Sequence, residues 1–180
     1  MSIRSRKVII PLAVSILAGG LSTRMGRDKA RLRIGGRTML ARIRAVANVL
    51  GVPVRVIRKD RVARCGPLGG IYTALITSRA EAELFLPCDM PFITPELLRV
   101  LSARLKRGRL GVFAEADGMA GFPFIIGVEA LERVNCQIAA GKFSLQSLAG
   151  TLDAVRWRVP KSRRDELRNF NTPDDVVGLR

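Results

Sequence analysis

A short apolar segment that runs into two glycines most strongly constrains the fold of this chain. Val14–Ala18 is almost entirely apolar, and Gly19 and Gly20 follow it directly. A nearly continuous apolar run bounded by turn residues is typical of a strand that is buried on both faces. Such strands occur in parallel sheets that helices cover on both sides. We therefore expect Val14–Ala18 to be a central strand of an α/β domain.

The residues around this segment also allow a second interpretation, that of a secretory signal peptide. Arg4, Arg6 and Lys7 precede the apolar run, as basic residues do in such peptides. However, Pro11 and Ser15 interrupt the run, and it is shorter than the roughly 20 residues that span a bilayer. The three cysteines form no CxxC pair and no disulfide framework. We therefore expect a cytoplasmic protein with no signal peptide and no membrane contact.

The remainder of the chain alternates between strand-like and helix-like segments. We expect strands over 52–57, 84–87, 110–114, 124–128 and 155–159, and helices over 38–50, 71–78, 129–139 and 173–178. A further helix should be capped by Thr94, begin at Pro95 and end before Gly108. Because 180 residues suffice for one domain but not two, this alternation predicts a single domain over 1–180. Its fold class is α/β, a three-layer Rossmann-like fold with a mostly parallel sheet and helices on both faces.

Charge and composition limit the chemistry that the chain can perform. Lysine and arginine number 31 against 15 acidic residues, giving a net charge of +16 that attracts anions such as nucleotides. The chain has no histidine, which excludes histidine bases and histidine metal ligands. Aromatic residues make up 5% of the chain, so platforms for stacking nucleic-acid bases are scarce and we do not expect nucleic acid as a partner. Chemistry must therefore rely on carboxylates, lysine, arginine, the backbone and metal.

The loop after the first strand has the composition of a phosphate-binding turn. Its sequence from Leu17 to Lys29 is LAGGLSTRMGRDK. Glycine lacks a Cβ, so the backbone N–H groups at Gly19 and Gly20 can approach phosphates closely, and Arg24 and Lys29 add positive charge. The spacing matches neither a P-loop nor a dinucleotide-binding turn.

An acidic residue follows another apolar strand candidate. Asp89 lies just beyond 84–87, and ligands of open parallel sheets bind beyond the carboxyl ends of the strands. Asp89 should therefore lie on the same edge as the glycine loop. Mg²⁺ commonly uses one or two carboxylates together with phosphate oxygens of the substrate, which makes Asp89 our candidate metal ligand. The alternative is that Asp89 only caps the turn at Pro91.

These two motifs resemble those of the MobA-like nucleotidyltransferases, and in particular of the molybdenum cofactor guanylyltransferases. The resemblance extends from Val14 to Asp175. It includes Asp60 ahead of the Gly66–Gly70 segment, the Asp117-Gly118 pair followed by Phe122-Pro123, and the ending NFNTPDD at 169–175.

The resemblance implies transfer of GMP from GTP to the terminal phosphate of molybdenum-molybdopterin, with release of pyrophosphate. It implies Mg²⁺ as cofactor, and molybdoenzymes or other cofactor-biosynthesis proteins as partners. Asp60 would contact the nucleoside, either at the N1–H and N2–H₂ donors of guanine or at the ribose. The candidate site residues are then Leu17, Ala18, Gly19, Gly20, Lys29, Asp60 and Asp89 for GTP, and Asp89 for the metal. Those for catalysis are Arg24, Lys29 and Asp89, and those for the acceptor are Gly66, Pro67, Leu68, Gly69, Asn169 and Asn171.

The chain departs from the family pattern at two places. The segment 51–65 leaves room for one strand where the family usually has two, and an asparagine that contacts the nucleotide has no counterpart. Phe122 stands where a histidine or glutamine is common. Two alternatives therefore stay open. One is a related transferase that uses CTP or another nucleotide, with molybdopterin, cobinamide phosphate or a sugar phosphate as acceptor. The other is a binding homologue that has lost catalysis.

Overall fold

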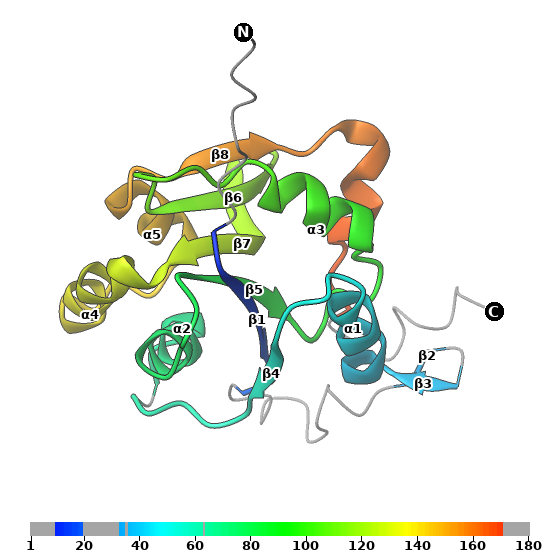
Figure 1. Cartoon of the computed structure of the whole chain (residues 1–180), viewed down its shortest axis with the longest axis horizontal. Helices are drawn as coiled ribbons and strands as arrows, with labels where there is room; N and C mark the ends of the chain where they lie inside the picture. The colour runs from blue at the N-terminus through cyan, green and yellow to red at the C-terminus, as the bar shows by residue number, and fades with distance from the viewer. Residues whose placement is uncertain (1–9, 20–32, 35, 63, 171–180) are drawn as a thin grey trace, which may run out of the picture.

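A six-stranded sheet forms the centre of the molecule (Figure 1). The computed structural model describes residues 10–19, 33–34, 36–62 and 64–170. The strand order is β4-β1-β5-β7-β6-β8, and only β7 runs against its neighbours. The sheet is therefore mostly parallel, as predicted. Its strands are β1 (Leu12–Leu17), β4 (Val54–Ile57), β5 (Ala82–Pro87), β6 (Gly111–Ala116), β7 (Met119–Gly127) and β8 (Val155–Arg158).

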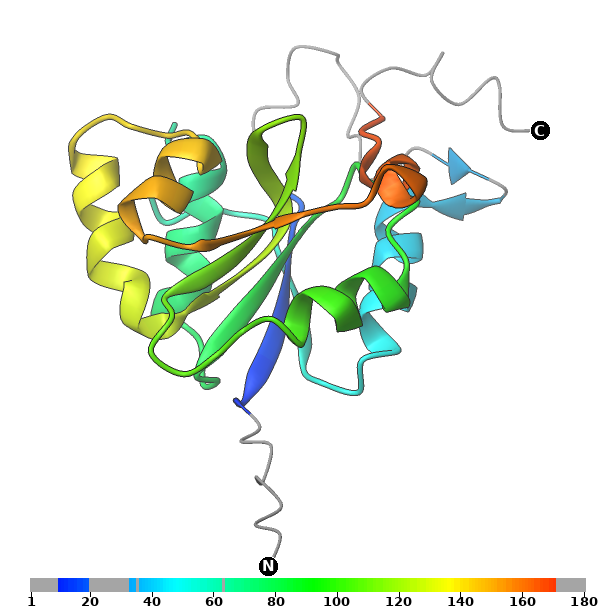
Figure 2. The same ribbon diagram turned by 90° about the horizontal axis from the view of Figure 1, so that it is seen from above.

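Helices cover both faces of the sheet, which gives the three predicted layers (Figure 2). On one face lie α1 (Met39–Asn48) and α3 (Pro95–Ser102). On the other lie α2 (Pro67–Ile76), α4 (Leu131–Ala139) and α5 (Leu145–Thr151). A small hairpin of β2 (Arg33–Ile34) and β3 (Arg37–Thr38) precedes α1, and two 3₁₀ segments, η3 (Val128–Ala130) and η4 (Lys161–Leu167), complete the described fold.

Strand β1 shows why the sheet needs cover on both sides. Val14 and Ile16 are fully buried in the core beneath α1 and α3, whereas Leu17 belongs to the core beneath α2. Ser15, which interrupts the apolar run, is also fully buried. Its hydroxyl donates to Glu83 Oε2 at 2.8 Å, and Arg55 Nη2 lies 2.6 Å from Glu83 Oε1. The serine is thus part of a polar network across three strands, so its burial is compensated.

Two helices begin after a capping threonine, and of the two caps the one at Thr94 was predicted. Thr38 Oγ1 accepts a hydrogen bond from Ala41 N, and Thr94 Oγ1 accepts one from Leu97 N, each at 3.1 Å. A side-chain oxygen at this position satisfies an N–H group that the helix itself leaves unpaired. The helix that Thr94 caps ends at Ser102, earlier than predicted.

Other boundaries differ from the sequence prediction. Helix α2 begins at Pro67 and not at Ile71, because proline suits the first helical turn and Leu68 N already bonds to Cys65 O. Strand β7 begins at Met119, five residues early, because Asp117 and Gly118 form a tight turn with positive φ that joins β6 directly to β7. Helix α5 was not predicted, and the helix predicted over 173–178 lies outside the described residues.

The described residues contain neither a helix that could span a membrane nor a second strand in the segment 51–65. In the part of the chain that the structure describes, no helix is long and apolar enough to cross a bilayer. The described residues of 51–65 contain one strand, β4, and it forms an edge of the sheet. The segment thus has the single strand that its length predicted.

Candidate functional site

Three predicted site segments follow the three parallel strands β4, β1 and β5. Leu17 pairs in register with Ile57 on one side and with Pro87 on the other, so the three strands end at the same level. Ala18 N extends the contact by donating to Ile57 O at 2.9 Å. The chain beyond β1 leads to Gly19, that beyond β4 to Asp60 and that beyond β5 to Asp89. The structure thus places them on one edge of the sheet, where open α/β sheets bind ligands.

The Asp60 carboxylate lies among glycines of two different elements. A Cβ atom on Gly69 would lie 2.9 Å from Asp60 Oδ2 and 2.6 Å from Val62 O. A Cβ on Gly70 would lie 3.3 Å from Asp60 Oδ1, and one on Gly19 would lie 3.4 Å from the same oxygen. Asp60 therefore packs between the end of β1 and the first turn of α2. Any side chain at position 69 would displace the loop that carries Asp60.

The surroundings of Asp60 affect its charge in two opposite ways. Burial raises the pKa of Asp60 above its ordinary value of 3.8, because desolvation disfavours the charged form. The amino end of α2, which carries partial positive charge, lies beside the carboxylate and favours the ionised form. A partly desolvated carboxylate of this kind is a strong acceptor for N–H or O–H groups of a ligand.

A buried threonine that no sequence motif indicated connects the Asp60 loop to α2. Thr73 Oγ1 accepts a hydrogen bond from Arg61 N at 2.9 Å and donates to Gly69 O at 2.7 Å. One hydroxyl thus connects the residue after Asp60 with the glycine that packs against Asp60. The sequence contains only a weak signal for it, the spacing of four residues between Gly69 and Thr73 on a helix.

Asp89 lies in the turn that follows β5, and the end of the described chain contacts that turn. Asp89 is partly exposed, and its backbone oxygen accepts a hydrogen bond from Phe170 N at 2.8 Å. Asn169, which is exposed, is the residue immediately before this contact. The fold therefore brings together two predicted site residues, Asp89 and Asn169, from opposite halves of the sequence.

The predicted acceptor segment 66–69 is only partly accessible. Gly66 has a φ of 55°, which favours glycine, and it is exposed beside Phe143. Pro67 is partly exposed, whereas the Leu68 side chain is fully buried in the core and Gly69 faces Asp60. Of these four residues, Gly66 and Pro67 are therefore the ones that a ligand can reach. The other predicted site residues, Gly20, Arg24, Lys29 and Asn171, lie outside the described part of the chain.

The acidic residues of the site suit a metal ion that arrives with its substrate. Within the described ranges, no group of three or more Asp, Glu or Cys side chains could hold a metal by itself. Mg²⁺ does not need such a cage, because it commonly binds through one or two carboxylates and completes its shell with phosphate oxygens and water. Asp89, a single acidic residue that is partly exposed, fits that mode of binding.

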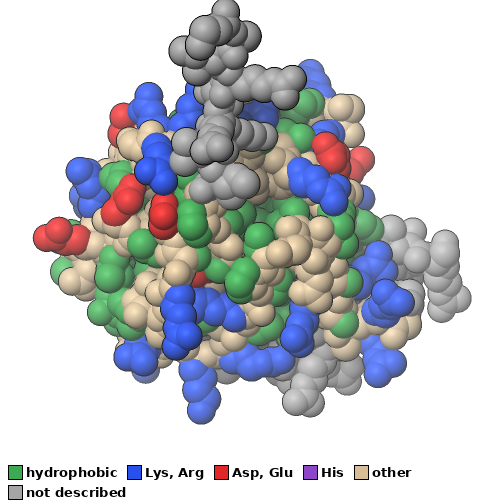
Figure 3. Space-filling model, in the orientation of Figure 1, with side chains coloured by type: hydrophobic (Ala, Val, Ile, Leu, Met, Phe, Trp, Pro, Cys, Tyr) green, Lys and Arg blue, Asp and Glu red, His purple; other side chains and the backbone are tan. Residues whose placement is uncertain are grey.

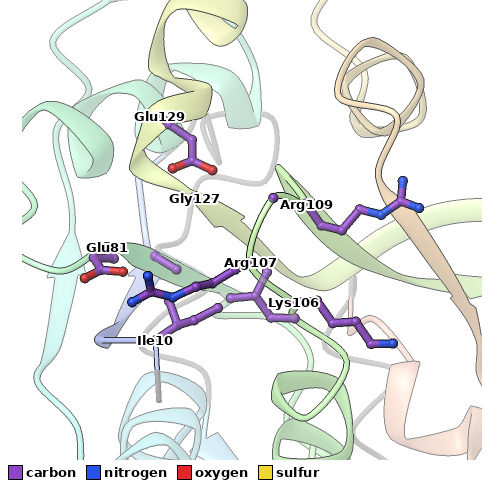
Figure 4. A pocket seen from close by; sticks show the side chains of 10 residues that line it. Ile10, Glu81, Lys106, Arg107, Arg109, Gly127 and Glu129 are labelled. Carbon is purple, nitrogen blue, oxygen red and sulfur yellow. The ribbon is translucent and has the colours of Figure 1, made fainter. Parts of the chain in front are cut away.

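A charged cavity of about 320 Å³ lies at the opposite edge of the sheet (Figure 4). Glu81, just before β5, and Glu129, just after β7, line the cavity together with Lys106, Arg107 and Arg109 of the loop before β6. This is the amino end of the parallel strands, so the cavity is separate from the edge that contains Asp60 and Asp89. The side chain of Arg109 points away from the cavity and lies 3.5 Å from Asp153.

Lysine and arginine side chains are spread over the visible face of the molecule (Figure 3). They do not form one continuous stripe on it. On the Asp60 loop, Arg58, Lys59, Arg61 and Arg64 are exposed. This distribution gives a general attraction for anions, with a local concentration of positive charge beside the candidate nucleotide site.

Comparison with known proteins is consistent with this geometry. The MobA-like NTP transferase domain matches residues 14–155. A probable molybdenum cofactor guanylyltransferase from Opitutus terrae is 31% identical over 188 residues, covering 91% of this chain and 92% of the relative. A molybdenum cofactor guanylyltransferase from Xanthomonas euvesicatoria is 32% identical over 174 residues, covering 88% of this chain and 89% of the relative.

Solved structures show the same fold. The molybdopterin-guanine dinucleotide biosynthesis protein A of Archaeoglobus fulgidus superposes with a TM-score of 0.70 at 21% identity, over 93% of this chain and 96% of that one. The 2-C-methyl-D-erythritol 4-phosphate cytidylyltransferase of Thermus thermophilus superposes with a TM-score of 0.63 at 14% identity, over 92% and 95% of the two chains. At these identities the likeness establishes the Rossmann-like nucleotidyltransferase fold.

Proposed function

The chain belongs to the MobA-like NTP transferase family, and from this premise we propose that it is a Mg²⁺-dependent guanylyltransferase. It would transfer GMP from GTP to the terminal phosphate of molybdenum-molybdopterin and release pyrophosphate. The observation that most supports the proposal is the Asp60 carboxylate, which packs against Gly19 and Gly69 on the edge of the sheet that also contains Asp89. The residue that would contact the nucleoside and the residue that would bind the metal therefore lie on one edge.

Asp60 would select the base of the nucleotide. Guanine presents two adjacent donors, N1–H and N2–H₂, to a carboxylate, whereas adenine and cytosine do not present that pair. A contact with the ribose hydroxyls would use the same carboxylate but would not discriminate between bases. The glycine at position 69 lets α2 approach Asp60 closely, and Thr73 keeps the loop against the helix.

The proposed chemistry needs no covalent enzyme intermediate. An oxygen of the acceptor's terminal phosphate forms a new bond to the α-phosphorus of GTP, while the bond from that phosphorus to the β-phosphate bridging oxygen breaks and pyrophosphate leaves. Because the attacking phosphate is already anionic, a chain without histidine is not at a disadvantage. Catalysis then depends on positioning and on neutralising charge in the transition state.

Asp89 would hold the metal, and Lys29 and Arg24 would provide further positive charge. When bound, Mg²⁺ neutralises phosphate charge and orients the triphosphate. Gly19 and Gly20 would bring backbone N–H groups to the phosphates. Gly66, Pro67, Asn169 and Asn171 would contact the acceptor. We further propose that the reaction takes place in the cytoplasm, where molybdoenzymes or other cofactor-biosynthesis proteins would be partners of the protein.

Calorimetric titration with GTP, CTP and ATP, each with and without Mg²⁺, tests the proposal. We expect binding that is selective for GTP and stronger with Mg²⁺. Equal affinity for the three nucleotides would show that the single edge strand β4 leaves the base pocket incomplete, and the guanine assignment would then be wrong.

A pyrophosphate-release assay with GTP and molybdopterin tests turnover separately from binding. Steady release that requires both substrates is the expected result. Tight, Mg²⁺-dependent GTP binding without release of pyrophosphate would instead identify a binding homologue that has lost catalysis.

A further inference from the structure

The last described segment of the chain crosses the edge of the sheet that contains the candidate site. We call residues 161–170 the C-terminal strap; it includes η4, which lies beside α3 in both views of the ribbon (Figures 1 and 2). Arg164 Nη1 contacts Asp117 Oδ1 at 2.6 Å, at the turn between β6 and β7. Near the start of α3, Glu166 accepts hydrogen bonds from Arg163 and from the Thr94 hydroxyl. The strap is therefore attached at two places before it reaches the Asp89 turn.

At its end the strap inserts an aromatic side chain beside that turn. Phe170 is 1% exposed and packs with the fully buried Met39, the first residue of α1. The rings of Phe170 and Phe92 meet edge to face, with their centroids 5.1 Å apart. This small cluster is separate from both cores that cover the sheet. Phe170 thus joins the strap, the start of α1 and the chain just after Asp89.

The same residue contacts Asp89 directly through the backbone. Phe170 N donates to Asp89 O at 2.8 Å. This hydrogen bond restrains the peptide plane of the residue whose carboxylate is the candidate metal ligand. The ring contacts keep Phe170 in place, so the hydrogen bond holds the Asp89 backbone against a fixed partner. Groups that orient a metal ligand from around the site typically contribute tenfold to a hundredfold to metal affinity, and this hydrogen bond acts on Asp89 through its backbone.

We propose that Phe170 is a positioning residue for Asp89, which it orients for binding of a divalent cation together with the nucleotide. The inference rests on the proposed function only in taking Asp89 as the metal ligand. Phe170 does not itself touch the reacting atoms. The contacts of its ring with Phe92 and Met39 fix the end of the strap. The backbone N–H group of Phe170 is thereby held where it donates to Asp89 O and restrains the Asp89 turn.

The experiment compares Phe170→Ala, Phe170→Leu and Leu167→Ala in the full chain. Leu167 lies on the same strap but packs against the core beneath α3 and not against Phe92 or Met39, so its replacement is the matched control. Mn²⁺ binding in the presence of GTP is measured by electron paramagnetic resonance, and GTP binding without metal is measured by calorimetry. Circular dichroism establishes that each variant is folded.

We expect Phe170→Ala to weaken Mn²⁺ binding in the GTP complex by about tenfold. GTP binding without metal should change less than about twofold, because Asp60 lies on a separate loop. Phe170→Leu, which retains an apolar side chain, should recover much of the metal affinity, and Leu167→Ala should bind Mn²⁺ as the unmodified protein does.

Three outcomes would overturn the inference in distinguishable ways. Normal Mn²⁺ affinity in folded Phe170→Ala would show that Phe170 does not position Asp89. Equal losses in Phe170→Ala and Leu167→Ala would show a general effect of the strap on stability. If the unmodified protein binds GTP but no Mn²⁺ with it, the metal assignment of Asp89 fails, and the inference fails with it.

Discussion

The two carboxylates of the candidate site are held in place by different means. Asp60 is positioned by β1 and by its sequence neighbours β4 and α2, through glycines and one threonine that bring backbones into close contact. Asp89 lies in a turn that contacts the C-terminal strap, through a backbone hydrogen bond to Phe170 and the packing of Phe92 against the Phe170 ring. One acidic residue thus depends on local close packing, and the other depends also on a distant part of the chain.

This difference has a functional meaning. A carboxylate that selects a base needs a rigid, partly desolvated surrounding, which glycine-lined close packing provides. A carboxylate that holds a metal together with substrate phosphates needs a particular orientation while it stays open to the ligand. A distant strap can orient the backbone without covering the carboxylate. We therefore expect substitutions on the Asp60 side to affect nucleotide affinity, and those on the Asp89 side to affect metal binding and turnover.

The largest effect should come from Asp89→Asn, which removes the candidate metal ligand's charge and keeps its size. Mg²⁺-dependent turnover should fall by about a thousandfold, the upper range for loss of one preorganised electrostatic group. Binding of GTP without metal should change little. Pyrophosphate release at saturating Mg²⁺ measures the effect, and Glu96→Gln, an exposed acid on α3, is the control. A rate within a factor of three of the original would show that Asp89 is not the metal ligand.

A smaller effect, on affinity and not on turnover, is expected for Asp60→Asn. Asparagine has a single acceptor oxygen and no charge, so GTP binding should weaken by about tenfold to a hundredfold, as hydrogen bonds to charged groups are worth about 1.5–3 kcal/mol. Calorimetry with GTP at several pH values measures this effect. If the variant binds GTP as tightly as the original, Asp60 does not contact the nucleotide.

The raised pKa of Asp60 determines the sign of the pH dependence. Guanine donors need the ionised carboxylate, so GTP affinity of the original protein should fall as the pH drops through a pKa above 3.8, and the variant should lack this dependence. In the protein without nucleotide, the raised pKa means that ionised Asp60 destabilises the folded state, and this penalty grows as the pH rises from 3.8 through the raised pKa and is fully present above it. Asp60→Asn should therefore raise the stability of the free protein near neutral pH while it weakens binding.

Gly69→Ala should weaken GTP binding by about tenfold. Its new methyl group would lie 2.6 Å from Val62 O and 2.9 Å from Asp60 Oδ2, so the loop must move. Overpacking of this kind destabilises proteins by about 1–3 kcal/mol. Gly150→Ala is the matched control, since its Cβ on α5 would meet no atom within 4 Å. Chemical denaturation and calorimetry should show loss of stability and affinity at position 69 and a small gain in stability at position 150.

Features of the fold that depend on local sequence signals could be predicted. The apolar runs, the cap at Thr94 and the glycine motif are local signals, and they correctly indicated the α/β class, most strands and the edge of the sheet where Gly19 and Asp89 lie. The start of α2 at Pro67 was predicted too late because the glycines were interpreted as loop. Helix α5, a short segment, was missed for lack of a long periodic pattern.

The anchoring of Asp89 could not be predicted from such signals. Phe170 is a single apolar residue between two asparagines, and nothing near it indicates which turn it contacts. The strap before it is polar and forms a 3₁₀ segment, which lacks the periodicity of a packed helix. The contact of Phe170 with Asp89 joins distant parts of the chain, so it depends on the finished fold. Thr73 lies close to Arg61 and Gly69 in the sequence, but one hydroxyl on a helix is too weak a signal to predict its bridge.

Glu166→Gln should give the smallest effect and tests whether the strap acts as one unit. Burial raises the pKa of Glu166, but hydrogen bonds from Arg163 and Thr94 outweigh it, so this pKa lies below its ordinary value of 4.5. Ionised Glu166 therefore stabilises the folded state above pH 4.5, and this contribution is lost as the pH falls through the lowered pKa.

Denaturant unfolding of the original protein and of Glu166→Gln, near pH 7 and in acid, measures that contribution. We expect the variant to be less stable by under about 1 kcal/mol near pH 7, as for ion pairs in contact with water, and the difference to vanish in acid. Mn²⁺ binding in the GTP complex should stay unchanged, because Phe170 still fixes the end of the strap against Phe92 and Met39. If metal affinity fell as in Phe170→Ala, the strap would position Asp89 through all its attachments together, and the orienting role would belong to the whole segment and not to its last residue.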